Sequence, residues 1–382
     1  MKIRRILSWS RDSIVLALCA SACTHSGATP SSPAPRGAAP VVAAATLTRV
    51  VDSLFAPFST GDVPGASVLI VEDGKVLVRR SFGMAELEAH RPVTPATNFR
   101  LASLTKQFTA MSVMILADRG QLRFDDAIGG IIPGLPPHLQ PITVRQLLNH
   151  VSGLADYEDL MSPGVTVPLK DADVLALLKA HDSTKFAPGS EYEYSNSGYT
   201  MLAQIVEHVS KQRFADFLHH EIFEPLGMAH TVAFENGIST VSDRAYGYTL
   251  EGKSYVRTDQ SLTSSVLGDG GIYTSIDDLT RWDAALYTTR LVRAETMAEA
   301  VKPAHLTTGG RSDYGFGWFL GDYRGVEGTW HTGTTIGFRN AIRRFPSRGL
   351  TIVVLTNRDE AKPLEIADRL ADLMLFGGSA VH

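Results

Sequence analysis

The sequence predicts an α/β fold of the α+β sandwich type, in which an antiparallel sheet is flanked by helices and assembled from both chain ends. Residues 65–83 and 315–357 are rich in β-branched and aromatic side chains separated by short turns, which is typical of β-strands. Residues 115–270, between these regions, carry mainly helical patterns with long loops. Strands at both ends around a helical middle indicate a sheet domain with a mainly helical inserted domain.

The first elements of the body are a hairpin and a long apolar helix. In residues 65–83, GASVLIVEDGKVLVRRSFG, Asp73 and Gly74 are placed to form a tight turn between two β-branched runs. Residues 99–120, FRLASLTKQFTAMSVMILADRG, begin as a loop and become apolar. The spacing predicts a helix over 104–116 that faces a core through Phe108, Met111, Val113, Met114 and Leu116.

The remaining elements follow from caps, periodicity and turn residues. Thr143 and Gln146 have capping-box spacing, and Gly153 is placed to end that short helix. Helices are also predicted over 172–180, 200–220 and 275–287, with a last one over 362–375. Between the last two, successive strands are predicted in four segments: GFGWFLGDY (315–323), GTWHTG (328–333), FRNAIRRFP (338–346) and LTIVVLTN (350–357).

Composition and charge are those of an ordinary globular protein. Of the 382 residues, 44% are hydrophobic and 20% are charged, which allows a sizeable core. The formal net charge is -4, whereas nucleic-acid-binding proteins usually carry a basic patch. We therefore expect no nucleic-acid partner, and we expect a monomer.

The N-terminus resembles an export signal. MKIRR is basic, SIVLALCA is apolar and small residues follow, which predicts a signal peptide over 1–22 that is too short to span a membrane. Residues 20–22 before Cys23 resemble a bacterial lipoprotein cleavage box, so two outcomes stay open. Either a lipidated Cys23 tethers the protein to the membrane, or the signal is simply cleaved after Ala22.

The segment after the signal predicts a tether. Residues 23–46 are rich in Ser, Pro, Ala and Gly and are expected to form a flexible linker, and the folded domain is expected over 47–376. Cys19 and Cys23 are the only two cysteines of the chain, so no disulfide is expected in the body. We expect an exported protein, periplasmic or membrane-anchored in a bacterium.

Ser103 and Lys106 form the first candidate catalytic pair. Residues at i and i+3 of a helix lie on one face, close enough to interact. A serine hydroxyl is a weak nucleophile until a base takes its proton, and a lysine serves as that base when burial lowers its pKa. Ser-x-x-Lys is common by chance, however, so an N-terminal helix serine beside a solvated lysine is the alternative.

Two further segments carry polar groups suited to a hydrolytic site. In EYEYSNSGY, residues 191–199, Tyr194 is a candidate proton shuttle and Asn196 a candidate ligand for an amide substrate. In TWHTGTTIGF, residues 329–338, His331 and Thr332 are side-chain donors and the Thr334 N–H is a candidate for an oxyanion hole. Gly333 is expected on an edge strand, where it permits close approach of a ligand.

Other kinds of site are disfavoured. His219-His220-Glu221 lacks the spacing that places two metal ligands on one helical face, so no metal is expected. The sequence has no Gly-x-Ser-x-Gly elbow, no Walker loop and no dinucleotide fingerprint after a strand. No cofactor is expected.

Taken in order, SLTK, YSN and HTG resemble the Ser-x-x-Lys, Tyr-x-Asn and Lys/His-Thr-Gly motifs of the penicillin-recognising serine hydrolases. That family includes class C beta-lactamases, D-alanyl-D-alanine carboxypeptidases and related esterases. Further phrases are similar to family members, and the resemblance covers about residues 47–376: LLNHVSGL (147–154), FEPLGM (223–228), GDGGIYTSIDDLTRW (268–282) and YGFGW (314–318).

The resemblance implies a beta-lactamase/transpeptidase-like fold and a role for each motif residue. Ser103 would be the acylated nucleophile, with Lys106 as its proton acceptor or relay. Tyr194 would assist as a base and then activate water. Asn196 would bind the substrate amide, and His331, Thr332 and Gly333 would line the substrate site. The backbone N–H groups of Ser103 and Thr334 would form the oxyanion hole.

One departure from the class C pattern concerns charge. The third motif has His331 where class C enzymes usually carry lysine, and a histidine is mostly neutral near pH 7. This is more similar to the carboxypeptidase and esterase branches. Arg339 is a candidate cation for a substrate carboxylate, although an exposed strand arginine is the simpler interpretation.

Two hypotheses follow. The first is an exported serine hydrolase that forms an acyl-enzyme from a small-molecule or peptide substrate: a D-alanyl peptide, a beta-lactam or a small ester. The second is a catalytically weak binding protein or sensor of the cell envelope. The intact SLTK, YSN and HTG motifs favour the enzyme, and the sequence leaves the substrate open.

Overall fold

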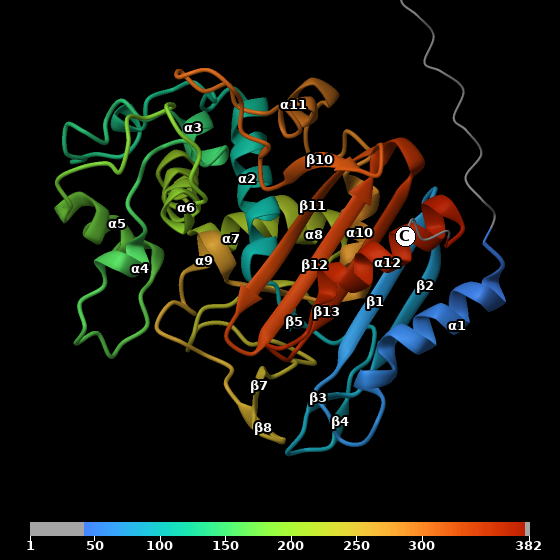
Figure 1. The fold of residues 1–382 in the computed structure, drawn as a ribbon. Helices are drawn as coiled ribbons and strands as arrows, with labels where there is room; N and C mark the ends of the chain where they lie inside the picture. Colours follow the sequence, from blue (N-terminus) through green and yellow to red (C-terminus); the bar gives the residue numbers. More distant parts are fainter. Residues whose placement is uncertain (1–41, 379–382) are drawn as a thin grey trace, which may run out of the picture. The chain divides into compact units, whose positions relative to one another are not determined.

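The computed structural model describes residues 42–378 (Figure 1). The predicted signal peptide, Cys23 and most of the predicted linker lie outside these residues. The first described helix, α1 (Ala44–Phe55), begins inside the segment expected to be linker. Within the described residues, no helix combines the length and the apolar composition needed to cross a membrane.

A six-stranded antiparallel sheet combines strands from both ends of the described chain. Its order is β10-β11-β12-β13-β1-β2. The strands span Ala66–Glu72 (β1), Lys75–Phe82 (β2), Phe319–Tyr323 (β10), Val326–Thr335 (β11), Phe338–Phe345 (β12) and Leu350–Thr356 (β13). Strand β1 pairs with β13 from Ala66 opposite Thr356 to Glu72 opposite Leu350. The predicted fold class and the hairpin turn at Asp73–Gly74 are both confirmed.

The two faces of the sheet are covered by different helices. Val68 and Ile70 of β1 face a core that contains residues of α1 and of α12 (Pro363–Phe376). Leu69 and Val71 alternate to the other face and join the larger core. The larger core also contains residues of α2 (Lys106–Asp118) and α10 (Ile276–Ala285). In Figure 1 α12 crosses the sheet, and α2 stands between the sheet and the mainly helical region.

The inserted region is built mainly from short helices. They are α3 (Val144–Leu148), α4 (Tyr157–Leu160), α5 (Asp171–Ala180), α6 (Asn196–Ser210), α7 (Phe214–Leu218), a π-helical turn (His219–Phe223), α8 (Glu224–Leu226) and α9 (Leu267–Gly270). Minor elements complete the fold: β3 (Met84–Glu86), β4 (Arg91–Pro92), β5 (Phe99–Arg100), β6 (Val232–Ala233), β7 (Tyr248–Glu251), β8 (Ser254–Arg257), β9 (Ile272–Thr274) and α11 (Ala294–Glu299).

Local predictions differ from the structure in a few places. The capping box of Thr143 and Gln146 is confirmed, but that helix ends at Leu148, before Gly153. The helix predicted over 200–220 begins earlier, at Asn196, and ends at Ser210, where Lys211 is left-handed. Helix α2 is buried on all sides from Lys106 to Leu116, because it lies between the sheet and α6 rather than on a surface.

The edge-strand prediction for Gly333 is wrong for the sheet as a whole. Strand β11 is an interior strand, paired with β10 and with β12. Strand β10, however, starts at Phe319 opposite Trp330, so the last residues of β11 extend past it. That part of β11 packs instead against the turn that carries Ser103.

Candidate active site

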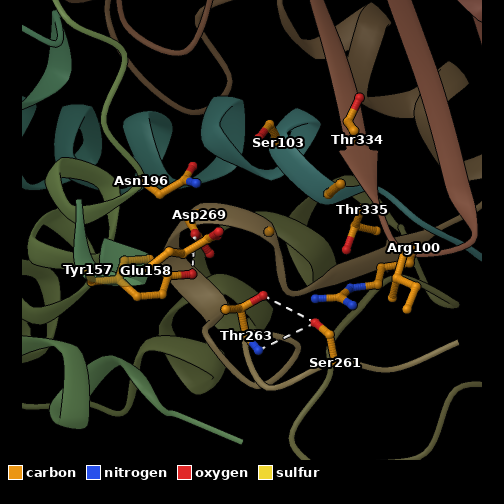
Figure 2. A pocket seen from close by; sticks show the side chains of 13 residues that line it. Arg100, Ser103, Tyr157, Glu158, Asn196, Ser261, Thr263, Asp269, Thr334 and Thr335 are labelled. Carbon is orange, nitrogen blue, oxygen red and sulfur yellow. Dashed lines mark hydrogen bonds between the residues drawn. The ribbon is translucent and has the colours of Figure 1, made fainter. Parts of the chain in front are cut away.

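Ser103 lies in a single 3₁₀ turn, Ala102–Thr105, that leads directly into α2. The preceding residue, Ala102, has φ of 51°, a left-handed conformation that is uncommon for a residue other than glycine. Strained backbone of this kind is often found beside catalytic groups. The turn leaves Ser103 at the wall of a polar cavity of about 240 Å³ (Figure 2).

The Lys106 side chain is buried behind Ser103. Its Nζ donates to Ser103 Oγ at 3.0 Å, to Asn196 Oδ1 at 2.8 Å and to the Asp269 carbonyl oxygen at 3.1 Å. Burial lowers the pKa of Lys106 to about 8, although the charges of Asp269, Asp156 and Glu158 raise it. A substantial fraction of Lys106 is therefore neutral near pH 8 and able to accept the Ser103 proton.

Tyr194 completes this group. The ammonium of Lys106 lies 4.9 Å from the centre of the Tyr194 ring. Burial raises the pKa of the Tyr194 phenol well above its usual range, and its hydrogen bond with Ser103 lowers it by less. The phenol is therefore protonated at neutral pH. In this state it is suited to donate a proton rather than to accept the proton of Ser103.

Asn196 begins α6 and points into the cavity. The capping residue Ser195 accepts the Gly198 N–H at 3.1 Å, which places Asn196 at the first helical position. Because Oδ1 of Asn196 already accepts from Lys106, its amide nitrogen is the group left to donate to a substrate carbonyl. This agrees with the geometry that the predicted role requires.

His331 is buried and differs from a charged lysine in its electrostatics. Burial and the nearby charge of Lys106 lower its pKa to about 3, so the ring is neutral at physiological pH. Its Nδ1 lies 2.7 Å from the Thr332 carbonyl oxygen and its Nε2 lies 2.9 Å from the Tyr314 hydroxyl. The tautomer with the proton on Nδ1 satisfies both contacts, with Tyr314 donating to Nε2.

The rest of the third motif is divided between two cavities. Thr334 lines the Ser103 cavity, together with Thr335 and Ile336. Thr332, Gly333 and Arg339 line a second cavity of about 310 Å³, which Thr334 also lines. Neither His331 nor Thr332 lines the Ser103 cavity, although the resemblance implies that both line the site.

One other prediction for this motif, a ligand close to Gly333, is corrected, and the contacts of Arg339 favour a structural role over that of a substrate cation. Gly333 is required by protein packing rather than by a ligand, since a Cβ there would lie 2.0 Å from the Leu101 carbonyl oxygen. The Arg339 Nη1 atom donates to the carbonyl oxygens of Thr335 and Phe338, at 2.7 and 2.8 Å. Arg339 thus holds its own hairpin and does not line the Ser103 cavity.

Several residues that build the site have no role predicted from the sequence. Asp269 and Tyr157 line the cavity, and the Tyr157 hydroxyl donates to Asp269 Oδ2 at 3.0 Å. His150 is buried, and its Nδ1 accepts the Ser195 N–H at 3.1 Å, which holds the segment that carries Tyr194 and Asn196. Burial keeps the pKa of His150 well below its usual value, so this ring is neutral too.

The signal for some of these residues was present in the sequence. His150 belongs to the phrase LLNHVSGL and Asp269 to the phrase GDGGIYTS, which are similar to family members but indicate no role for either residue. Arg100 and Glu158, which also line the cavity, lie outside these phrases. No group of three or more His, Cys, Asp or Glu suited to a metal occurs between residues 42 and 378.

Comparison with known proteins identifies the family. The model of the Beta-lactamase family matches residues 51–375. The chain belongs to the Beta-lactamase family. Penicillin-binding protein 4* of Bacillus subtilis is 33% identical over 332 residues, covering 81% of this chain and 72% of that protein. The match to Protein flp of Staphylococcus aureus spans 60% of the length of that protein.

Solved structures of this family share the fold. The octameric penicillin-binding protein homologue from Pyrococcus abyssi has a TM-score of 0.75 and 26% identity, covering 87% of this chain and 78% of that chain. The D-amino acid amidase from Ochrobactrum anthropi SV3 has a TM-score of 0.73 and 25% identity, covering 85% and 97%. Like these relatives, the protein is a serine hydrolase of the beta-lactamase and penicillin-binding-protein type.

Proposed function

We propose that the protein hydrolyses a small amide or ester through an acyl-enzyme on Ser103. The observation that carries this proposal is the 3.0 Å contact between Lys106 Nζ and Ser103 Oγ, made by a fully buried lysine whose pKa is lowered to about 8. A lysine in this state can act as a general base near neutral pH. The competing hypothesis, a catalytically weak sensor, would not require a lowered pKa at this position.

The proposed reaction proceeds in two halves. Neutral Lys106 takes the Ser103 hydroxyl proton as Oγ attacks the substrate carbonyl carbon, and the Ser103 and Thr334 N–H groups stabilise the oxyanion. The proton reaches the leaving group through Tyr194, whose phenol is protonated in the resting enzyme. The acyl-enzyme is then hydrolysed by a water that the same groups activate.

For the substrate, we propose that esters and simple amides react faster than beta-lactams. In a beta-lactam the carboxylate lies on the leaving-group side, where a fixed cation would favour it. The buried neutral His331 offers no such cation, and the Arg339 Nη1 atom is held by the carbonyl oxygens of Thr335 and Phe338. The likeness to a D-amino acid amidase supports an uncharged leaving group.

The test is hydrolysis of three substrates by the purified protein and by Ser103→Ala. The substrates are a short-chain p-nitrophenyl ester, nitrocefin and a D-alanyl-D-alanine peptide. We expect the ester to be turned over, nitrocefin to react poorly, and the alanine variant to be inactive. Turnover of none of them, with no Ser103 adduct of a fluorophosphonate or penicillin probe by intact mass, would favour the sensor.

For location we propose export, supported by the N-terminal pattern of residues 1–22. A lipid on Cys23 would tether the domain through the Pro- and Ser-rich segment that follows. Intact mass of the membrane-extracted protein, compared with Cys23→Ala, separates the two outcomes. A lipid mass lost in the variant supports the tether, and an unmodified protein that begins at Cys23 supports plain secretion.

A further inference from the structure

The groups that line the cavity beside Ser103 indicate which half of a substrate it would hold. This step rests on the proposed function. Tyr194, the proposed proton donor to the leaving group, does not line the cavity. Asn196, which can donate to a substrate carbonyl, and Thr334, on the oxyanion side, do line it. The acyl half of the substrate therefore extends into this cavity, and the leaving group departs on the Tyr194 side.

Arg100 is the cation of this cavity. Strand β5 carries it, and the residue is only 3% exposed. Its Nη1 donates to Ser264 Oγ at 2.6 Å, while its Nε is buried without a hydrogen-bond partner. Within residues 42–378, no carboxylate lies within ion-pair distance of this guanidinium.

Three other buried arginines also have a nitrogen atom without a hydrogen-bond partner, but each of them differs from Arg100 in having a carboxylate partner. Arg343 pairs with Asp368, Arg344 with Asp283 at 3.0 Å, and Arg358 with Glu360 at 3.2 Å. Each of these three is less than one-tenth exposed, as is Arg100. Burying a charge without a partner is costly, so an arginine left unpaired in a cavity is suited to an anion that enters from outside.

Hydroxyl groups surround this guanidinium. Ser261, Thr263 and Thr335 line the cavity near it, and Figure 2 shows the Arg100 side chain directed toward Ser261 and Thr263. Arginine and hydroxyl donors together form the usual environment for a carboxylate. The acids of the cavity, Glu158 and Asp269, lie on the other side of it in Figure 2.

The acidic side of the cavity has its own partners. Asp269 accepts a hydrogen bond from Tyr157. Burial raises the pKa of Asp269, and the charges of Lys106 and Arg100 offset part of this increase. Glu158 is half-buried, and burial and neighbouring acids raise its pKa. A substrate anion is thus repelled from the Glu158 side and attracted to the Arg100 side.

We propose that Arg100 binds a carboxylate on the acyl half of the substrate. The favoured substrates are then esters or amides of an acid that carries a second carboxylate at its far end. Arg100 acts as a specificity residue, and it takes no part in the proton transfers between Ser103, Lys106 and Tyr194. The alternative is that Arg100 only joins β5 to the loop at Ser264.

The experiment compares two matched esters: mono-p-nitrophenyl adipate, which has a free carboxylate, and its methyl ester, which has none. We expect kcat/KM of the wild-type protein to favour the free carboxylate about tenfold or more, as for a hydrogen bond to a charged group. Arg100→Gln should lower this ratio at least tenfold, and Arg100→Lys should retain part of it. Arg339→Gln is the matched control, and its ratio should equal that of the wild type.

The proposal is overturned if the wild type prefers the methyl ester, or if Arg100→Gln slows both esters equally, as a structural role predicts. Inhibition of the wild-type protein tests the proposal without any variant, in case Arg100→Gln does not fold. Adipate should inhibit methyl-ester hydrolysis competitively, with a Ki at least tenfold below that of adipamide, and equal inhibition overturns the proposal. If neither ester acylates Ser103 by intact mass, the proposed function fails first, and this inference fails with it.

Discussion

Gly333 of β11 lies directly against Leu101, so closely that a Cβ on Gly333 would be 2.0 Å from the Leu101 carbonyl oxygen. Leu101 precedes the turn that carries Ser103, so this contact fixes the distance between the nucleophile and the strand that carries Thr334. The glycine of the third motif thus acts on catalysis through backbone packing.

The substitution Gly333→Ala should therefore displace the Ser103 turn from β11. A shift of about 1 Å at a reacting group can lower the rate about 10²-fold, and we expect a loss of that order in kcat/KM for a p-nitrophenyl ester. Overpacking should also lower the free energy of unfolding by about 1–3 kcal/mol. Gly130→Ala is the matched control, because an added Cβ there meets nothing within 4 Å. Equal activity of the two variants would contradict this role.

The activity should rise with pH as Lys106 loses its proton. Its pKa of about 8 predicts that kcat/KM for an uncharged ester rises with pH, is half-maximal near pH 8 and levels off about one pH unit higher, because only the neutral amine accepts the Ser103 proton. The charge of Glu158 raises the pKa of Lys106, so Glu158→Gln should move the midpoint to lower pH. A pH–rate profile that is flat between pH 6 and 9 would exclude Lys106 as the base.

Removal of the Tyr194 hydroxyl should affect catalysis more than binding. The Tyr194→Phe substitution keeps the ring beside Lys106 but removes the proton relay, and general acid–base groups contribute about 10²–10⁴-fold to rate. We expect kcat to fall within this range with little change in KM, measured with the same ester. Tyr192→Phe is the control, since Tyr192 belongs to the same segment and is 37% exposed, whereas Tyr194 is the ring that lies beside Lys106. A similar loss in both variants would indicate a structural effect.

The buried histidine of the third motif should make the protein sensitive to acid. The pKa of His331 is lowered from 6.5 to about 3 in the folded state, so between these values the unfolded chain binds the proton and the folded chain does not. The free energy of unfolding therefore falls as pH decreases through this window, by up to about 1.4 kcal/mol for each pH unit.

His331→Asn tests this by removing the titrating ring. Urea unfolding at pH 6.5 and pH 4.5 should show a smaller loss of stability in the variant than in the wild type. Buried carboxyls act in the opposite direction: the pKa of Asp171 is raised to about 7, mainly by burial. Because Asp171 is present in both proteins, the difference between the two slopes isolates His331. Identical slopes would show that His331 does not titrate as described.

Local sequence patterns determined the secondary structure of the sheet and the identity of the motif residues. Alternation of β-branched residues and the Asp73–Gly74 turn predicted the first hairpin, because the period of two and the turn chemistry act within a few residues. The i, i+3 spacing likewise placed Lys106 beside Ser103, since helix geometry alone brings these positions together.

Only the tertiary structure decided which other groups meet at Ser103 and what charge they carry. Arg100 and Arg339 both lie close in sequence to a catalytic motif, but their environments differ. Arg100 bonds to Ser264 and pairs with no described carboxylate, whereas Arg339 bonds to carbonyl oxygens of its own hairpin. Burial, which depends on contacts between distant segments, makes His331 neutral and gives Lys106 its lowered pKa. Such contacts join residues far apart in the chain, and no local periodicity encodes them, because the free energy of a charge depends on everything packed around it.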